Sequence, residues 1–187
     1  EPSPVNVNYL EKNLELQGQD NYEVHNLACG DTDEEITFVI RDISNMCRVA
    51  KEGEIESGDK KFVKIPVKKL DTFLIDKKLP RLDLLRMDIE GSELRLFEGA
   101  IQTIRKYKPM IHMELHPGHL GPDNTRKVLQ FLKNEGYEFS TFMIGYLDTP
   151  LVGTRRDIKN YKIDDLLQMI DNDTHPRNIL LFIEHED

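Results

Sequence analysis

The sequence is poor in cysteine, has no excess of positive charge and contains no long apolar run. Its two cysteines, Cys29 and Cys47, allow at most one disulfide in 187 residues. A disulfide framework is therefore excluded, and a reducing compartment, the cytoplasm, is the expected location. No stretch is apolar for long enough to span a bilayer, and none has the pattern of a signal peptide.

The chain also lacks the positive charge that a polyanionic partner requires. It has 34 acidic and 25 basic residues, which give a formal net charge of −9 at pH 7. This balance argues against a nucleic-acid backbone or an anionic membrane as the main partner. A neutral or cationic ligand remains compatible with it.

Helical and strand-like hydrophobic patterns alternate along most of the chain. From Asp71 onward helices alternate with strands, and we expect the strands at residues 82–88, 108–115, 137–144 and 177–184. This order predicts one α/β domain with a mostly parallel sheet and helices on both faces. Upstream, residues 22–28 read as a strand, and segment 35–67 is predicted to be a hairpin outside the alternation.

The stretch LLRMDIEGSELRLFEGA places two carboxylates, Asp88 and Glu90, directly after a predicted strand. Gly91 allows a tight turn into the next helix, where Glu90 and Glu93 suit the positive helix start. The next strand, KPMIHMELHP, ends in Glu114 and His116. Ligands of parallel α/β folds bind at the carboxyl ends of the strands, so these acids are either parts of a site or solvated strand ends.

The segments LDLLRMDIEGSELRLFEGA, KPMIHMELHP, EGYEF and RNILLFIE, with NLACGD upstream, resemble the FkbM family of S-adenosylmethionine-dependent methyltransferases. The resemblance implies a Rossmann-like class I methyltransferase fold, in which the last strand runs antiparallel between two others. It also implies methylation of a hydroxyl on a sugar or small metabolite. S-adenosylmethionine is the implied cofactor, with Glu1, Asn26, Ala28 and Asp88 as the implied cofactor-binding residues.

In that family a first strand and a glycine-rich loop precede the EP motif, which here is Glu1-Pro2. The resemblance therefore implies that residues 1–187 are one domain, the larger C-terminal part of a methyltransferase domain that starts at the end of its second strand. The strand-helix-strand portion before it is expected to be missing. Uncovered sheet surface should then favour self-association and weaken cofactor binding.

The predicted catalytic residues are Asp88, Glu90, Glu114 and His116. Methyl transfer is an in-line displacement, so alignment dominates, and a base helps because a protonated alcohol is a poor nucleophile. His116 is the predicted base, oriented by Glu114 or Asp88, while Asp88 is alternatively the partner of the cofactor's amino group. A divalent ion bridging Asp88 and Glu114 is another possibility.

Three further hypotheses are open from the sequence: a zinc site, a two-metal phosphodiesterase and a non-catalytic binding domain. His112, Glu114 and His116 share strand parity as zinc ligands would, but they span about 13 Å on a straight strand, and His112 reads better as a satisfied core histidine. The motif MDIEGSE also fits the D-x-E of a two-metal phosphodiesterase or nuclease, although no basic or aromatic stripe accompanies it. The third hypothesis is a non-catalytic binding domain on a decayed methyltransferase fold.

Overall fold

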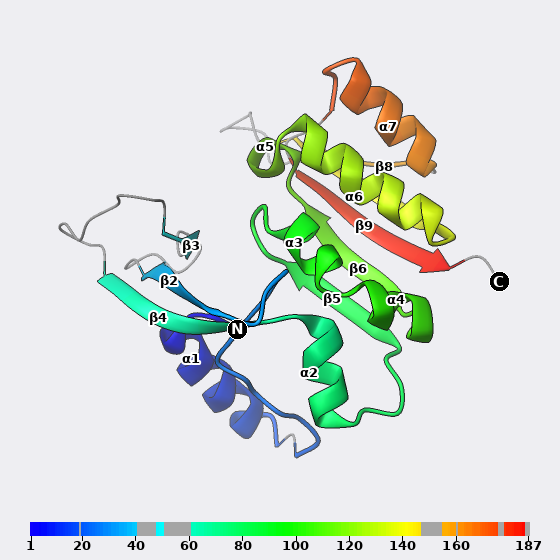
Figure 1. The fold of residues 1–187 in the computed structure, drawn as a ribbon. Helices are drawn as coiled ribbons and strands as arrows, with labels where there is room; N and C mark the ends of the chain where they lie inside the picture. Colours follow the sequence, from blue (N-terminus) through cyan, green and yellow to red (C-terminus); the bar gives the residue numbers. More distant parts are fainter. Residues whose placement is uncertain are drawn as a thin grey trace.

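The computed structural model describes residues 1–18, 20–40, 48–50, 61–146, 155–159, 161–175 and 178–185, which form a mixed α/β fold (Figure 1). The helices are α1 Pro4–Leu16, α2 Leu70–Lys77, α3 Glu93–Glu98, α4 Ile101–Tyr107, α5 Pro117–Leu120, α6 Pro122–Asn134 and α7 Ile163–Asp171. The strands are β1 Ala28–Cys29, β2 Glu35–Ile40, β3 Arg48–Val49, β4 Lys61–Lys68, β5 Leu84–Asp88, β6 Met110–Leu115, β7 Tyr137–Tyr146, β8 Arg155–Lys159 and β9 Asn178–His185.

The larger sheet has the strand order β5-β6-β9-β7-β8. β5 and β6 pair in parallel, and β9 lies between β6 and β7, antiparallel to both. The predicted position and direction of the last strand are thus confirmed. β7 also pairs antiparallel with β8, a strand that the sequence pattern does not predict. Since β8 and β9 oppose the direction of β5, β6 and β7, the described sheet is mixed rather than mostly parallel.

The smaller sheet has the order β1-β4-β2-β3, and β2 pairs antiparallel with β4 as the predicted hairpin requires. The strand predicted at residues 22–28 is wrong in extent, because β1 includes Ala28 and Cys29 alone. Just before β1, His25 and Asn26 form hydrogen bonds with the N-terminal residues instead of pairing with a neighbouring strand. The Asn26 side chain donates to the carbonyls of Glu1 and Pro2, and the N-terminal amine donates to the His25 carbonyl.

The core lies between the larger sheet and the layer formed by α3, α4, α6 and α7, which cover one face (Figure 1). Alternate residues of β6 and β9 point into it and are fully buried: Ile111, Met113, Leu115, Ile179, Leu181 and Ile183. On the opposite face Leu84 and Met110 remain 51% and 42% exposed. The expected covering of both faces is therefore not seen for β5 and β6 among the described residues.

Two details of the helices differ from the sequence pattern. The helix expected after Gly91 is divided into α3 and α4 at Gly99. Asp71, a residue type that favours the N-cap of its own helix, follows the first residue of α2. Its carboxylate instead accepts hydrogen bonds from the Gln102 and Thr103 amides at the start of α4. These bonds satisfy amides that have no partner within their own helix.

No helix in the described part of the chain has the length and apolarity needed to cross a bilayer. Cys29 is half-buried and has no disulfide partner among the described residues, and burial raises the pKa of its thiol. Cys47, its possible disulfide partner, lies outside the described residues.

Candidate active site

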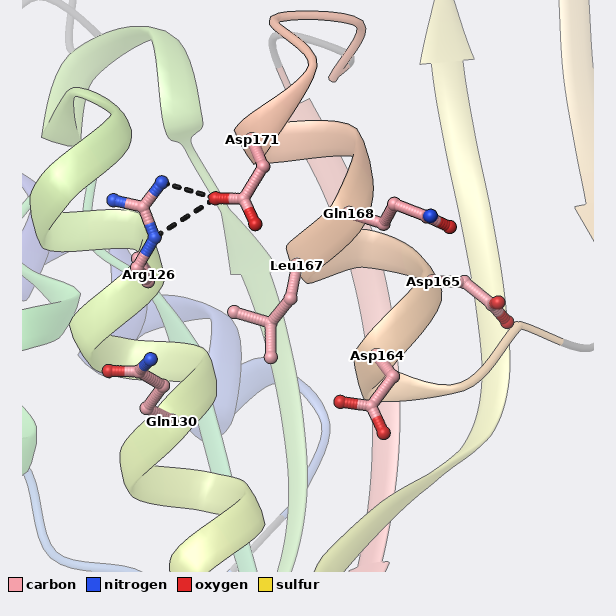
Figure 2. Close-up of a pocket in the computed structure, with 7 residues that line it drawn as sticks. All are labelled: Arg126, Gln130, Asp164, Asp165, Leu167, Gln168 and Asp171. Atoms are coloured by element: carbon pink, nitrogen blue, oxygen red, sulfur yellow. Dashed lines mark hydrogen bonds and ion pairs between the residues drawn. The ribbon is translucent and has the colours of Figure 1, made fainter.

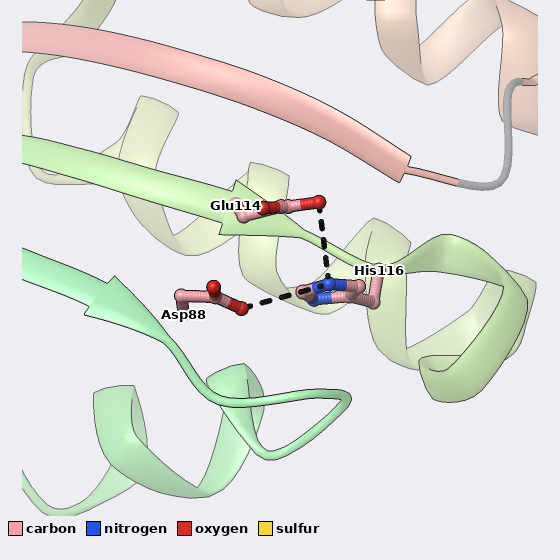
Figure 3. A group of neighbouring side chains, drawn as sticks. All are labelled: Asp88, Glu114 and His116. Carbon is pink, nitrogen blue, oxygen red and sulfur yellow. Dashed lines mark ion pairs between the residues drawn. The ribbon is translucent and has the colours of Figure 1, made fainter. Parts of the chain in front are cut away.

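The register of β5 and β6 places Asp88 and Glu114 side by side. They are the last pair of partners in the parallel ladder, and register partners in a sheet point to the same face. Figure 3 shows both carboxylates at the carboxyl ends of their strands, turned toward the imidazole of His116. The structure thus brings three of the predicted catalytic residues together.

The turn after β5 carries the fourth, Glu90. Glu90 and Gly91 have φ values of +50° and +96°, so two successive left-handed residues turn the chain from β5 toward α3. Glycine is required at position 91 for two reasons. A residue with a side chain rarely adopts this φ, and a Cβ would lie 2.7 Å from the Cβ of His119. The predicted role of Gly91 in a tight turn is confirmed. The turn brings the Glu90 carboxylate 3.2 Å from His119 Nδ1.

Behind His116 lies a residue whose role the sequence analysis missed. Glu93 is fully buried, and its Oε1 lies 2.7 Å from His116 Nδ1. The predicted orienting partners, Asp88 and Glu114, lie farther from the ring, so Glu93 is the residue that orients it. Glu93 reads in sequence as an ordinary acid of a first helical turn, and nothing local indicates that it is buried.

The other ring nitrogen of His116 faces three carboxylates. His116 Nε2 lies 3.6 Å from Glu90 Oε2, 3.6 Å from Glu114 Oε1 and 3.8 Å from Asp88 Oδ1. These separations exceed hydrogen-bond distance. The His116 ring is 1% exposed, whereas the three carboxylate side chains are 35–45% exposed. His119 stacks on His116 with ring centroids 5.6 Å apart.

The electrostatics of His116 reflect this surrounding. Burial lowers the pKa of the imidazole, but the hydrogen bond to Glu93 and the charges of the neighbouring carboxylates outweigh burial and raise it above its ordinary value. The cluster is therefore a place where positive charge is favoured. A protonated imidazole, a cationic ligand group or a metal ion each meets that demand.

Of the four residues predicted to bind the cofactor, Asp88 belongs to the His116 cluster, whereas Glu1, Asn26 and Ala28 lie in the N-terminal segment of the chain. Glu1 is exposed, and its Oε1 accepts hydrogen bonds from the Ser3 amide and the Asn6 side chain. Asn26 donates to the backbone of Glu1 and Pro2, and Ala28 begins β1. Their cofactor-binding roles stay predictions.

The zinc hypothesis for His112, Glu114 and His116, which the strand spacing argued against, is not supported. His112 stacks on its register partner Phe182, with ring centroids 4.2 Å apart, rather than joining Glu114 and His116. It is not a satisfied core histidine either, because its buried Nε2 has no hydrogen-bond partner among the described residues. The group whose ligand atoms do come together is Asp88, Glu114 and His116.

A cavity lies elsewhere, on the helical layer between α6 and α7 (Figure 2). It is an open cavity of about 450 Å³, and an ion pair between Arg126 and Asp171 spans it. Its other polar side chains are Gln130, Asp164, Asp165 and Gln168. It contains none of the predicted site residues and no histidine, so the cluster at the ends of β5 and β6 is the better candidate.

Comparison with known proteins points to one family. Residues 1–139 match the model of the methyltransferase FkbM domain. A solved structure, methyltransferase FkbM from Methylobacillus flagellatus KT, matches with 18% identity and a TM-score of 0.49, covering 97% of this chain and 35% of that one. This chain thus spans about a third of the length of that protein. No curated protein sequence matches at a significant level.

Proposed function

The chain belongs to the FkbM methyltransferase family, and from that premise we propose that it transfers a methyl group from S-adenosylmethionine to a hydroxyl oxygen of a sugar or small metabolite. The observation that carries the proposal is the cluster around His116, in which a buried imidazole faces the carboxylates of Asp88, Glu90 and Glu114. The family relation supports methyl transfer in general, and the cluster supports oxygen as the acceptor atom.

The finer description of the fold is also a proposal. We infer a Rossmann-like class I methyltransferase arrangement, supported by the antiparallel β9 between β6 and β7. In such a sheet the carboxyl ends of the strands form the binding edge. Asp88 and Glu114 end adjacent strands at that edge.

The chemistry of the predicted donors fits S-adenosylmethionine. The exposed carboxylates of Glu1 and Asp88 suit its ribose hydroxyls and its ammonium group, and the acidic cluster suits a sulfonium cation. When bound, the cofactor supplies an electrophilic methyl group. Glu1 and Asp88 would hold and orient it, and Asn26 would support Glu1 through the hydrogen bond to its backbone carbonyl.

The chain's own contribution to the reaction is to align the acceptor hydroxyl and to accept its proton as the methyl group is transferred. The carboxylates of Glu90 and Glu114 accept hydrogen bonds from an acceptor hydroxyl and thereby orient its oxygen. Glu93 keeps the His116 ring fixed behind them through its 2.7 Å contact with Nδ1. A positioned general base that accepts the hydroxyl proton, the role predicted for His116, contributes about 10²–10⁴-fold in rate.

The test is a methyl-transfer assay with labelled S-adenosylmethionine and a panel of sugars and hydroxylated metabolites. Asp88→Asn should lower turnover by about 10²-fold or more, because it removes a positioned charge while keeping its shape. Glu98→Gln, which removes an exposed acid from α3, is the matched control and should leave turnover unchanged. Near-normal turnover in Asp88→Asn would place the chemistry elsewhere.

The same assay addresses the hypothesis of a non-catalytic binding domain. Such a domain binds S-adenosylmethionine, as calorimetric titration can show, yet gives no labelled product with any acceptor. The phosphodiesterase hypothesis is not carried forward, because the family is one of methyltransferases.

A further inference from the structure

We propose that Asp88, Glu114 and His116 bind a divalent first-row metal ion of the Mn²⁺ or Zn²⁺ kind. The ion would lie at the carboxyl ends of β5 and β6, on the edge where the acceptor hydroxyl is proposed to bind. That the ion serves methyl transfer rests on the proposed function. That the ion binds rests on the geometry of the three side chains.

The three ligand atoms already lie close to a coordinating arrangement. One atom from each side chain falls within 4.8 Å of the other two, and His116 Nε2 lies 3.6 Å from Glu114 Oε1 and 3.8 Å from Asp88 Oδ1. Ligand atoms about 2.1 Å from a tetrahedral ion are about 3.4 Å apart. The last two separations therefore need to shrink by only a few tenths of an ångström, which rotation of the two partly exposed carboxylates can supply.

The buried imidazole is an independent sign of a ligand. His116 is 1% exposed, its Nδ1 is held by the fully buried Glu93, and its Nε2 points at the carboxylates without reaching hydrogen-bond distance. A histidine whose far nitrogen donates to a carboxylate is the usual arrangement behind a metal ligand, because it fixes the tautomer and leaves the other nitrogen free to coordinate.

The charges around the cluster also favour a cation. Among the described residues, the ion pairs of Asp88 and Glu90 are with His116 and His119, and neither carboxylate pairs with a lysine or arginine. A partly buried carboxylate such as Asp88, which has a histidine but no lysine or arginine as its partner in the described part of the chain, is stabilised by a cation placed beside it.

The donor set selects the kind of ion. Two carboxylates and one imidazole suit Mn²⁺ or Zn²⁺, whereas Ca²⁺ and Mg²⁺ prefer oxygen ligands alone and no thiolate is present for a soft ion. With the ion bound, His116 Nε2 is a ligand and cannot also be the base predicted from the sequence. Asp88 and Glu114 then coordinate the ion instead of contacting the cofactor's ammonium group and the acceptor hydroxyl. The ion takes over the polarisation of the hydroxyl, and Glu93 becomes a positioning residue for a ligand.

The experiment titrates Mn²⁺ into the chelator-treated chain and follows the electron paramagnetic resonance signal of the free ion. We expect one Mn²⁺ per chain. Asp88→Asn and Glu114→Gln should each weaken binding by more than tenfold, and Glu93→Gln by about 10–100-fold through the ligand it orients. Glu98→Gln should bind like the unchanged chain. Failure of the unchanged chain to bind, or equal binding by all variants, would overturn the proposal.

Pulsed measurements on the same samples test His116 without replacing a buried residue. Coupling of the Mn²⁺ spin to an imidazole ¹⁴N is expected in the unchanged chain, and its absence would exclude His116 as a ligand. Asp88 is 42% exposed, so Asp88→Asn should melt within a few degrees of the unchanged chain. Lost binding accompanied by unfolding would instead count against a coordinating role for Asp88.

A parallel methyl-transfer assay separates this inference from the proposed function. Mn²⁺ binding with ¹⁴N coupling but no product from any acceptor would leave the metal site and remove the proposed function. Turnover that survives chelation in a chain that binds no Mn²⁺ would leave the proposed function and remove the metal site. Turnover that is lost on chelation and restored by Mn²⁺ supports both.

Discussion

The backbone of Gly99 packs directly on the backbone of Gly30. A Cβ at position 99 would lie 1.8 Å from the Gly30 carbonyl oxygen, a separation that no side chain tolerates. This contact joins the EGA and ACGD segments of the sequence and coincides with the break between α3 and α4. The glycine of EGA is therefore structural rather than catalytic.

Gly99→Ala should destabilise the fold by about 3 kcal/mol or more, because the backbone on both sides must move to admit a methyl group. Denaturant unfolding followed by circular dichroism measures the change. Gly18→Ala is the informative comparison, since Gly18 has a φ of +65° and open space around it. It should cost only about 1 kcal/mol. Equal costs would mean that the Gly30 contact contributes nothing.

Asp71→Ala should lower the free energy of unfolding by about 1 kcal/mol. It removes the carboxylate that accepts hydrogen bonds of 3.1 Å from the Gln102 amide and 2.7 Å from the Thr103 amide, which is the work of an N-cap although Asp71 lies on another helix. Asp76→Ala, an exposed position on the same helix, is the control and should change stability by less than about 0.5 kcal/mol. A similar loss in both variants would show a general effect on α2 instead.

Ionisation of the buried Tyr137 hydroxyl should lower the stability of the fold in alkaline solution. This hydroxyl donates to the Pro109 carbonyl at 3.0 Å, and burial, with the charge of Glu135, raises the pKa of Tyr137 to about 12. An unfolded tyrosine ionises near pH 10, so this contribution to stability is intact below about pH 10 and is lost as the pH rises toward 12.

Melting temperatures measured between pH 8 and pH 11.5 check this expectation. They should fall more steeply above pH 10 in the unchanged chain than in Tyr137→Phe, which has no group to ionise there. Tyrosinate absorbance at 295 nm should show a late ionisation near pH 12 that is absent in Tyr137→Phe. Parallel slopes in the two proteins would contradict the assignment.

The exposed edge and face of the larger sheet at β5 predict self-association. β5 is an edge strand of this sheet, and Leu84 and Met110 are exposed on the face that the helices do not cover. Sedimentation velocity at rising concentration should show dimers or larger species, and Leu84→Lys should return the chain to monomers. Leu79→Lys, at a similarly exposed leucine before the strand, should leave association unchanged. A monomer at every concentration would refute the prediction.

Several features of the fold could be predicted because they depend on local patterns. The alternating apolar residues of β6 and β9 indicate strands whatever packs against them. Ser3 followed by Pro4, a pattern typical of a helix start, begins α1 in the structure. The placement of Asp88 at a strand end follows from where the apolar run stops. Strand 22–28 failed because its polar groups found partners at the N-terminus, a contact that no local pattern contains.

In the candidate site, too, some features follow from local sequence and others from tertiary structure. Local sequence by itself determined that Asp88 and Glu114 end strands and that Gly91 allows a left-handed turn, because strand ends and turns are properties of neighbouring residues. Tertiary structure alone decided that Asp88 lies beside Glu114 and that buried Glu93, 23 residues away in sequence, holds His116. The physical reason is that strand register and helix packing are set by the whole core, and a shift of one residue would turn these side chains to the other face of the sheet.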